Sequence, residues 1–366
     1  MLIFRYLFRE VCGSFLAVTI VLSLIFLSGR FVRYLADAAA GQFTGNLVFS
    51  IMLYRLPGFM ELILPLALFL GIMLSYGRLY VESEMVILQA CGVSKRQMLM
   101  YTLGPALLVM LLVASLTLYL TPVGWKKFHE IWANPDNYSG LGTLVAGNFK
   151  RLGADGSVIY TGELNSRKTR LGDVFIARSD AENPEKLTLV KARQGEVINK
   201  GTQYRYIELY DGVEITGEMG HSAYDVTRFD TYGQLLTERK KTYTEVDSID
   251  ALSMQALAQK QDTKAQALYQ WRISLPVLVP VIALIALALS ETSHRRGRYI
   301  KMLPGLIIYI MYVTILVAAR SAIERGTLPA AIGLWPVHAM FLLLGIMLLY
   351  APEFRRTIAY WRHGRA

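Results

Sequence analysis

Long apolar stretches at both ends of this 366-residue chain constrain its fold more than any other feature. A helix needs about 20 apolar residues to cross the roughly 30 Å hydrocarbon core of a bilayer. Inside that core every backbone polar group must bond within the chain, so such stretches are expected to be helical. We therefore predict six transmembrane helices, at residues 11–28, 47–76, 98–122, 273–290, 302–319 and 335–350.

The composition agrees with a membrane protein, because 54% of the residues are hydrophobic and only 18% are charged. The mean hydropathy of +0.36 is also high for a soluble domain of this length. The first apolar stretch could alternatively be a signal peptide, with Ala36 and Ala38 marking a cleavage site. We expect the stretch to be retained, because it is long for a signal core and Arg30 and Arg33 precede that site.

The distribution of Lys and Arg predicts the orientation, because positive charge is retained on the cytoplasmic side. The outer side has only Arg30, Arg33, Arg320 and Arg325, with Arg55 ambiguous. Both termini are therefore expected in the cytoplasm and the middle segment outside it. The net charge of +10 belongs to the membrane part, which argues against nucleic-acid binding by a basic soluble module. The basic residues of the inner side are Arg5, Arg9, Arg78, Lys95, Arg96, Arg295, Arg296, Arg298, Lys301, Arg355, Arg356, Arg362 and Arg365.

The middle of the chain has a different pattern, with short alternating stretches rich in Val, Ile, Tyr and Thr from Asn148 onward. Period-two alternation is typical of strands, and Asp155-Gly156 and Asp211-Gly212 are predicted hairpin turns. The strand spacing favours a β-sandwich or jelly roll. An open inner face could hold an acyl chain, whereas a closed core would hold only side chains, and the pattern favours neither.

We therefore predict an α-helical membrane protein with six transmembrane helices and an inserted all-β domain, a β-jellyroll. Residues 1–122 would hold the first three helices, with a short helix at about 80–95 between the second and third. Residues 123–270 would form the β domain and its flanking linkers. Residues 271–366 would hold the last three helices and a basic tail.

The sequence carries no recognisable catalytic or metal-binding motif. A G-x-x-x-x-G-K-[ST] phosphate loop, an H-E-x-x-H zinc motif and a G-x-S-x-G nucleophile elbow are all absent. The two cysteines, Cys12 and Cys91, lie outside the middle domain, so no disulfide is expected there. We predict a non-catalytic protein with no metal and no cofactor, and any ATP would be bound by another subunit.

Polar side chains in or near the apolar stretches are candidates for function, because placing them in a membrane is costly. Glu61 could face a protein interior or lie at the outer interface. Arg30, Arg33 and Arg320 are candidate contacts to an anionic lipid headgroup, because guanidinium groups pair bidentately with phosphate. Snorkelling to the surrounding lipid headgroups is the alternative for these arginines.

Segment 80–95, YVESEMVILQACGVSK, separates the second and third apolar stretches and is expected on the cytoplasmic side. Its apolar residues recur at helical spacing, which predicts a short amphipathic helix. One face of this helix would offer an acidic and apolar surface to a groove on a soluble partner. Alternatively, the carboxylate of this face only stabilises the start of the helix through the helix dipole. The residues of this face are Glu84, Ile87, Leu88 and Cys91.

The wording of segment 80–95, with RYLFRE near the start and LILPLALFLG in the second stretch, resembles the LptF/LptG permease family of lipopolysaccharide export. The E-S-E and A-C-G-x-S-K patterns resemble the LptF branch, and the similarity extends over the whole chain. This resemblance implies that segment 80–95 is a coupling helix inserted into a dimeric LptB-like ATPase, which binds the ATP. Glu84 would be the acidic contact of the coupling helix.

The resemblance also implies further partners, which are an LptG-like permease, an LptC-like membrane-anchored β-jellyroll protein and lipopolysaccharide. The implied function is to extract lipopolysaccharide from the outer leaflet of the inner membrane and pass it to a periplasmic protein bridge toward the outer membrane. On the residues alone, the alternative is a membrane-anchored receptor or assembly scaffold whose β domain binds an envelope protein. An enzyme that remodels envelope lipids is disfavoured, because the nucleophile and metal motifs are missing.

Overall fold

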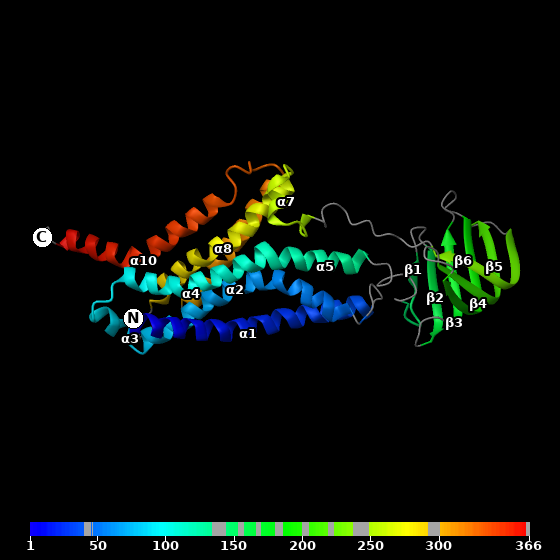
Figure 1. Ribbon diagram of the computed structural model, residues 1–366, viewed down its shortest axis with the longest axis horizontal. Helices are drawn as coiled ribbons and strands as arrows, with labels where there is room; N and C mark the ends of the chain where they lie inside the picture. Colours follow the sequence, from blue (N-terminus) through cyan, green and yellow to red (C-terminus); the bar gives the residue numbers. More distant parts are fainter. Residues whose placement is uncertain are drawn as a thin grey trace. The chain divides into compact units, whose positions relative to one another are not determined.

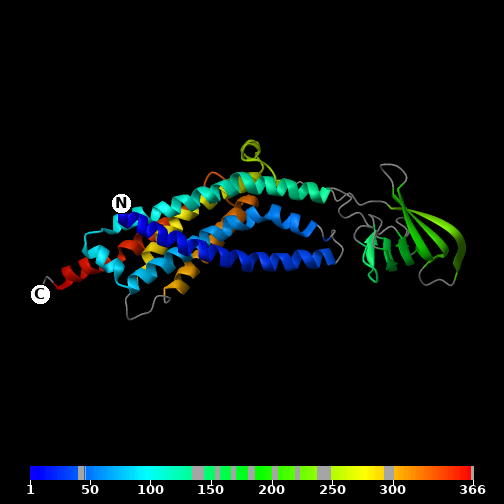
Figure 2. The ribbon, with the colours of Figure 1, turned by 60° about the horizontal axis from the view of Figure 1, so that its bottom comes forward.

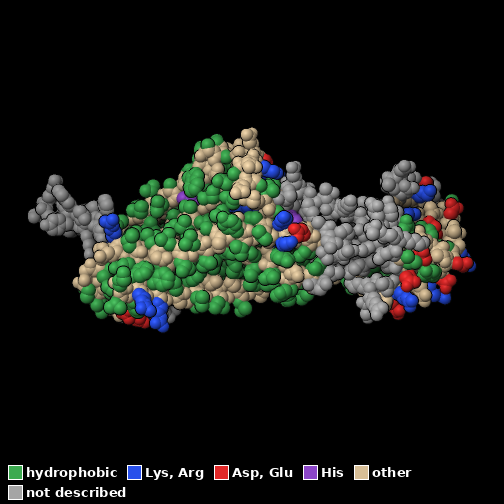
Figure 3. All heavy atoms as spheres, viewed as in Figure 1, with side chains coloured by type: hydrophobic (Ala, Val, Ile, Leu, Met, Phe, Trp, Pro, Cys, Tyr) green, Lys and Arg blue, Asp and Glu red, His purple; other side chains and the backbone are tan. Residues whose placement is uncertain are grey.

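The computed structural model describes residues 1–39, 45, 47–133, 144–152, 157–165, 170–179, 186–199, 205–218, 223–236, 249–291 and 301–363. The chain forms two compact units. The helical unit comprises Met1–Gly29, Leu53–Lys127 and Thr244–Ala366, and the sheet unit comprises Arg30–Met52 and Phe128–Tyr243. In Figure 3, hydrophobic side chains cover the visible face of the helices, whereas Asp, Glu, Lys and Arg side chains gather on the strands.

Among the described residues, five helices are long and apolar enough to cross a membrane. They are α1 (Leu2–Ala39), α2 (Leu47–Val81), the continuous helix Lys95–Ile131, α8 (Thr263–Ser290) and α9 (Met302–Glu324), as Figure 1 shows. The sixth predicted stretch forms the shorter apolar part, Trp335–Tyr350, of α10 (Trp335–His363). Two short helices, α3 (Glu84–Ala90) and α7 (Met254–Gln259), precede α4 and α8. The predicted helical membrane protein is thereby confirmed.

The third long helix has three parts, α4 (Lys95–Ser115), the π-helical turn η1 (Leu116–Leu120) and α5 (Thr121–Ala133). The helix continues past Pro122, where the apolar stretch ends, because proline is tolerated in the first turn of a helical segment. Pro122 has no backbone N–H and cannot donate to the carbonyl four residues earlier. The wider π turn lies immediately before this position, where the regular hydrogen-bond ladder is interrupted.

Helix α8 is the centre of the helical unit, with α4, α7, η1, α9 and α10 as its neighbours (Figures 1 and 2). Of the most apolar 18-residue stretch of α8, 72% is buried, compared with 6% of the corresponding stretch of α1. Because lipid tails are as apolar as leucine, hydrophobicity alone does not bring helices together in a bilayer. Helices associate there through close packing of their surfaces. Gly345 of α10 shows this closeness, because an added Cβ would lie 2.9 Å from the side chain of Leu284 on α8.

The buried residues of helix α1 all lie in the first half of its length. Its buried residues, Leu7, Val11 and Phe15, recur every four positions and therefore lie on one face. Phe15 meets α2 at Gly71, where an added Cβ would lie 2.9 Å from the backbone Cα and N of Phe15. Glycine at position 71 is thus what lets the two helix backbones touch.

The sheet unit contains one antiparallel sheet whose six strands follow sequence order. The strands are β1 (Lys150–Leu152), β2 (Ser157–Leu164), β3 (Arg170–Ser179), β4 (Lys186–Asn199), β5 (Arg205–Glu218) and β6 (Tyr224–Leu236). The predicted inserted β domain is confirmed. The described strands form one continuous sheet and not the two separate sheets of a β-sandwich, and the jelly-roll shape stays a prediction.

A bend across the strands explains how a single sheet can enclose a hydrophobic core. In β3 the buried residues are Leu171, Val174 and Ile176, so the usual alternation of faces reverses once, next to Asp173. Asp173 has φ 47° and Asp211 of β5 has φ 52°, in the left-handed region that non-glycine residues rarely adopt. The strand register is the same on both sides of these residues, so the strands kink without an inserted residue. Both halves therefore direct apolar side chains to one core.

This bend also corrects a predicted turn. Asp211-Gly212 lies inside β5 and is not a hairpin, because the pair supplies the positive φ that the kink requires. Gly212 is needed there, since an added Cβ would lie 2.7 Å from the carbonyl oxygen of Lys191 and would also meet the ring of Phe229. The other predicted turn, Asp155-Gly156, lies outside the described residues.

The close approach of α1 to α2 yields a prediction. Gly71→Ala should lower the stability of the protein by about 1–3 kcal/mol, because the added methyl group overpacks the contact with the Phe15 backbone. Gly13→Ala is the matched control, since no atom lies within 4 Å of its added Cβ. Thermal unfolding in detergent measures both. Equal melting temperatures for the two variants would contradict the close contact.

Candidate functional site

The short helix α3 is bounded by two specific backbone motifs. At its end, the N–H of Gly92 donates to the carbonyl of Gln89 at 3.0 Å, and the N–H of Val93 donates to that of Leu88 at 3.1 Å. These are the two bonds of a Schellman motif, which favours glycine because of the positive φ, here 95°. Ser94 then begins α4 with a capping box to Gln97. The A-C-G-x-S-K motif therefore encodes the end of α3 and, directly after it, the start of α4.

One side of α3 is anchored and the other is open. Met85 is fully buried, and Leu88 packs against the core of the helical unit. Val86 and Ile87 are 54% and 59% exposed, and Cys91 is exposed as well. The predicted amphipathic helix is thus present, although it is shorter than segment 80–95. Ile87 and Cys91 lie on its open side, and Leu88 lies partly inside.

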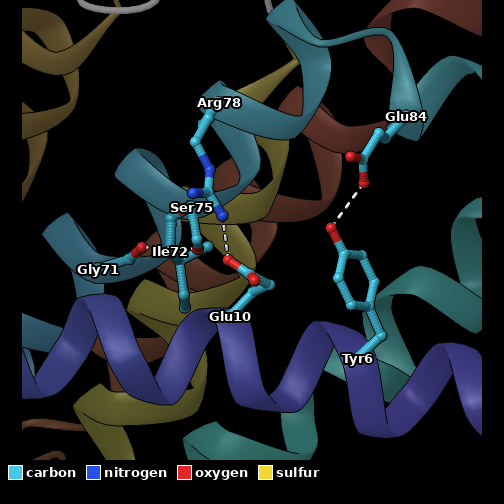
Figure 4. Close-up of polar contacts among 7 residues, drawn as sticks. All are labelled: Tyr6, Glu10, Gly71, Ile72, Ser75, Arg78 and Glu84. Carbon is cyan, nitrogen blue, oxygen red and sulfur yellow. Dashed lines mark hydrogen bonds and ion pairs between the residues drawn. The ribbon is translucent and has the colours of Figure 1, made fainter.

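Glu84, the first residue of α3, is half-buried and has a partner far away in the sequence. The hydroxyl of Tyr6 on α1 donates a hydrogen bond to Oε2 of Glu84 at 2.6 Å (Figure 4). The preceding residue, Ser83, has φ 63°, so the chain turns sharply between α2 and α3. One helical turn beyond Tyr6, Glu10 forms an ion pair with Arg78 near the end of α2 (Figure 4).

A second polar site is a cavity of about 270 Å³ in the helical unit. Glu61 lines it and accepts a hydrogen bond from the hydroxyl of Thr121 at 3.0 Å. Of the two possibilities for Glu61, the structure has it facing a cavity inside the protein. The other charged residues that line the cavity are Arg55, Asp250, Arg272 and Arg320.

The arginines of this cavity contact aromatic rings and backbone carbonyls. Arg272 is 3% exposed, and it donates to the carbonyl oxygens of Asp250 and Leu252, each at 2.6 Å. Arg320 pairs with Glu324 at 2.8 Å and lies 5.3 Å from the centre of the Trp271 ring. Of the three predicted headgroup contacts, only Arg320 lines this cavity. Arg30 and Arg33 are exposed on α1 and belong to the sheet unit.

One buried histidine is held between three helices. His338 of α10 hydrogen-bonds through Nε2 with Ser274 of α8, and its Nδ1 lies 2.5 Å from the hydroxyl of Tyr312 on α9. Both ring nitrogens are thus used by neighbouring hydroxyls. Within the described ranges, no group of three or more His, Cys, Asp or Glu residues has an arrangement that could hold a metal ion.

A comparison with known protein families agrees with this architecture. The family model described as "Lipopolysaccharide export system permease LptF/LptG" matches residues 5–351. The chain belongs to this permease family. The permease is 29% identical over 348 residues to the lipopolysaccharide export system permease protein LptF of Escherichia coli K12. That alignment covers 95% of this chain and 94% of the relative. The LptF proteins of Escherichia coli O157:H7 and Shigella flexneri align with the same values.

These matches confirm the resemblance to the LptF branch that the E-S-E and A-C-G-x-S-K patterns suggested. With its apolar helices, the permease is a multi-pass protein of the inner membrane. Its family consists of transport permeases, and the matched range contains α3 and the cavity.

Sequence reasoning missed three features of the permease. Val86 is nearly as exposed as Ile87, although it is not among the residues of the predicted face. Tyr6 was missed because 78 residues separate it from Glu84, although its spacing from Glu10 on one helix face was a usable signal. Arg272 has no role in the sequence predictions, and only the fold brings it to the carbonyls of Asp250 and Leu252.

Proposed function

We propose that the permease is a membrane subunit of an ATP-driven transporter that extracts lipopolysaccharide from the outer leaflet of the inner membrane. It then passes the lipid to a periplasmic protein bridge toward the outer membrane. The observation that carries this proposal is the architecture of α3, a short helix anchored by Met85 that leaves Val86 and Ile87 open. An open apolar helix between two long apolar helices is suited to receive a soluble partner.

The partner proposed at α3 is a dimeric LptB-like ATPase, which binds the ATP, so that the permease needs no cofactor of its own. Covering Val86 and Ile87, which are 54% and 59% exposed, would contribute on the order of 2 kcal/mol to docking. Glu84 would pair with a basic group of the ATPase, since charge-assisted hydrogen bonds are stronger than neutral ones. Ile87, Leu88 and Cys91 would complete the contact.

The other proposed protein partners are an LptG-like permease and an LptC-like membrane-anchored β-jellyroll protein. Support for the second permease comes from α1 and α9, whose apolar windows are only 6% and 22% buried within the chain. These surfaces are available to lipid or to another set of helices. In the proposed topology both termini are cytoplasmic and the sheet unit is periplasmic, as the distribution of Lys and Arg favours.

Acyl chains are proposed to move along the sheet unit. Cross-strand pairing aligns five apolar residues in one row, Val158, Ala177, Leu189, Ile215 and Val226. This row lies on the face opposite to the buried Ile159, Ile176 and Val190, because neighbouring residues of a strand alternate between faces. Ile215 and Val226 are 37% and 61% exposed, so the row offers accessible apolar surface.

The headgroup is proposed to contact the arginines of the outer side. Arg320 lines the cavity with Arg55 and Arg272, and Arg30 and Arg33 are exposed three residues apart on α1. The guanidinium groups proposed for this contact are those of Arg30, Arg33 and Arg320, since a guanidinium can form paired hydrogen bonds with a phosphate.

The central test is ATP-dependent lipopolysaccharide release from proteoliposomes that contain the permease, its partner permease and the ATPase. Glu84→Ala should lower release about tenfold, because a charge-assisted contact to the ATPase is lost. Glu82→Ala is the matched control, since Glu82 is exposed and lies outside α3. Release that is independent of ATP would reject the transporter and favour a receptor or scaffold.

The arginines of α1 are tested by photocrosslinking to lipopolysaccharide. Reversal of both charges, Arg30→Glu with Arg33→Glu, should reduce the crosslinked fraction several-fold, because phosphate is then repelled. The variant with Lys at both positions keeps the charge and should retain most of the crosslinking. Equal crosslinking in all three proteins would show that these side chains only anchor α1 at the interface.

The row on the sheet is tested by a photocrosslinker placed at single positions. Val158, Leu189 and Ile215 should crosslink to lipopolysaccharide during ATP turnover, because their side chains share the proposed lipid face. Ile159 and Val190 are the controls on the opposite face. The reverse pattern would place the lipid on the buried face of the sheet.

A further inference from the structure

Two side chains of α1 reach the two sides of the turn between α2 and α3. Tyr6 and Glu10 are four residues apart and therefore lie on the same face of α1. Tyr6 binds Glu84, the first residue of α3, and Glu10 binds Arg78, near the end of α2 (Figure 4). The residues of the turn itself, Glu82 and Ser83, lie between these two contacts. The base of α1 thus bridges the connection that joins α2 to α3.

We propose that Tyr6 is a positioning residue for Glu84, and that Tyr6, Glu10, Arg78 and Glu84 form a strap through which a displacement of α3 is transmitted to α1. The proposal rests on the proposed function in one respect, since it takes α3 as the place where the ATPase acts. It adds a route from that place into the membrane.

The chemistry of Glu84 allows it to serve both contacts at once. A carboxylate has two oxygens and about four lone-pair sites. The Tyr6 hydroxyl donates to Oε2, which leaves Oε1 able to accept from a basic group of a docked partner. Because Ser83 turns the chain just before α3, the direction of Glu84 is not set by a regular helix on its N-terminal side. Tyr6 supplies that orientation from a neighbouring helix.

The packing of α1 explains why this helix would move when α3 is displaced. Its buried residues, Leu7, Val11 and Phe15, all lie in the first half of the helix, the half that also carries the strap. Phe4 contacts α4 beside Gly104, and Phe15 rests on Gly71. Beyond Phe15, no residue of α1 is buried within the described chain, up to Ala39. Within the helical unit α1 is one uninterrupted helix, so a movement of its base reaches the residues beyond Phe15.

The strap lies among partly exposed polar groups, which suits a contact that changes during a working cycle. Tyr6 is 40% exposed, and the side chains of Arg78 and Glu10 are 43% and 25% exposed. Their main effect is expected on the coupling of movements, because the apolar contacts of Leu7, Val11 and Phe15 hold α1 in place without them.

The first experiment measures lipopolysaccharide released per ATP hydrolysed in proteoliposomes that contain the complete complex. Tyr6→Phe keeps the ring and removes the donor, so release per ATP should fall about three- to tenfold while ATPase association is retained. Tyr119→Phe makes the same chemical change at a 72% exposed tyrosine outside the strap and should behave as wild type. Equal values for Tyr6→Phe and Tyr119→Phe would overturn the role of Tyr6.

The second contact of the strap, the ion pair between Glu10 and Arg78, allows a rescue test. Glu10→Arg and Arg78→Glu should each reduce release per ATP, because each single change places like charges side by side. The double variant restores an opposite-charge pair and should recover most of the loss. A double variant that is no better than the singles would remove this pair from the strap.

A third readout follows α1 directly and does not require transport. Ser23 of α1 and Met60 of α2 are in contact beyond the strap, with 3.6 Å between Oγ and the sulfur. In the double variant Ser23→Cys, Met60→Cys, the yield of the disulfide between the two new cysteines should change when the ATPase is trapped with nucleotide. Adding Tyr6→Phe to the double variant should make that change smaller. The two single-cysteine variants are the controls.

The readouts separate the two ideas. If wild-type complexes release no lipid with ATP, the proposed function fails, but the crosslinking experiment still tests the strap. If wild type releases lipid and Tyr6→Phe leaves both release and the nucleotide-dependent crosslink unchanged, the strap fails and the proposed function stands.

Discussion

Close packing between helices of similar hydrophobicity is the interaction on which the helical unit depends. The bilayer stabilises each apolar helix individually but does not favour one helix contact over another. Small residues and complementary surfaces decide which helices meet. At Gly71 an added methyl group would meet the backbone of Phe15 and prevent the observed approach, and at Gly345 it would force the side chain of Leu284 to move.

Buried polar groups add specificity to this packing. Arg272 of α8 holds the carbonyls of Asp250 and Leu252, and His338 joins α8, α9 and α10 through two hydroxyl groups. In an apolar environment an unpaired polar group is costly, so each of these contacts favours one arrangement over its alternatives. The C-terminal helices are therefore held by both shape and hydrogen bonds.

The N-terminal helix is built differently, and this difference fits the proposed function. Helix α1 is anchored at its base by Leu7, Val11 and Phe15, and most of its apolar window stays accessible to lipid or to a second permease. The same base is tied to α3, whose open side offers Val86 and Ile87 to a soluble partner. A firmly packed centre with a loosely packed N-terminal helix is a suitable construction for converting a movement at one end into a change in the membrane.

The sequence by itself determined the helical membrane class, the inserted β domain and the family resemblance. These depend on local properties: the length of apolar stretches, period-two alternation, and patterns such as A-C-G-x-S-K that set a helix stop and a helix start. The amphipathic character of α3 follows from the same kind of local pattern, although Leu88, predicted on the partner-facing side, packs partly against the core of the helical unit.

Only the tertiary structure decided which apolar helix is central. Helices α1 and α8 are both long and apolar, but 6% of the most apolar 18-residue stretch is buried in α1 and 72% in α8. It also decided the single bent sheet, because Asp211-Gly212 can supply a positive φ either to a hairpin or to a kink within a strand. The pairing of Tyr6 with Glu84 was likewise invisible in the sequence. Such contacts join residues that are distant along the chain, and their geometry is set by helix packing, which no local pattern encodes.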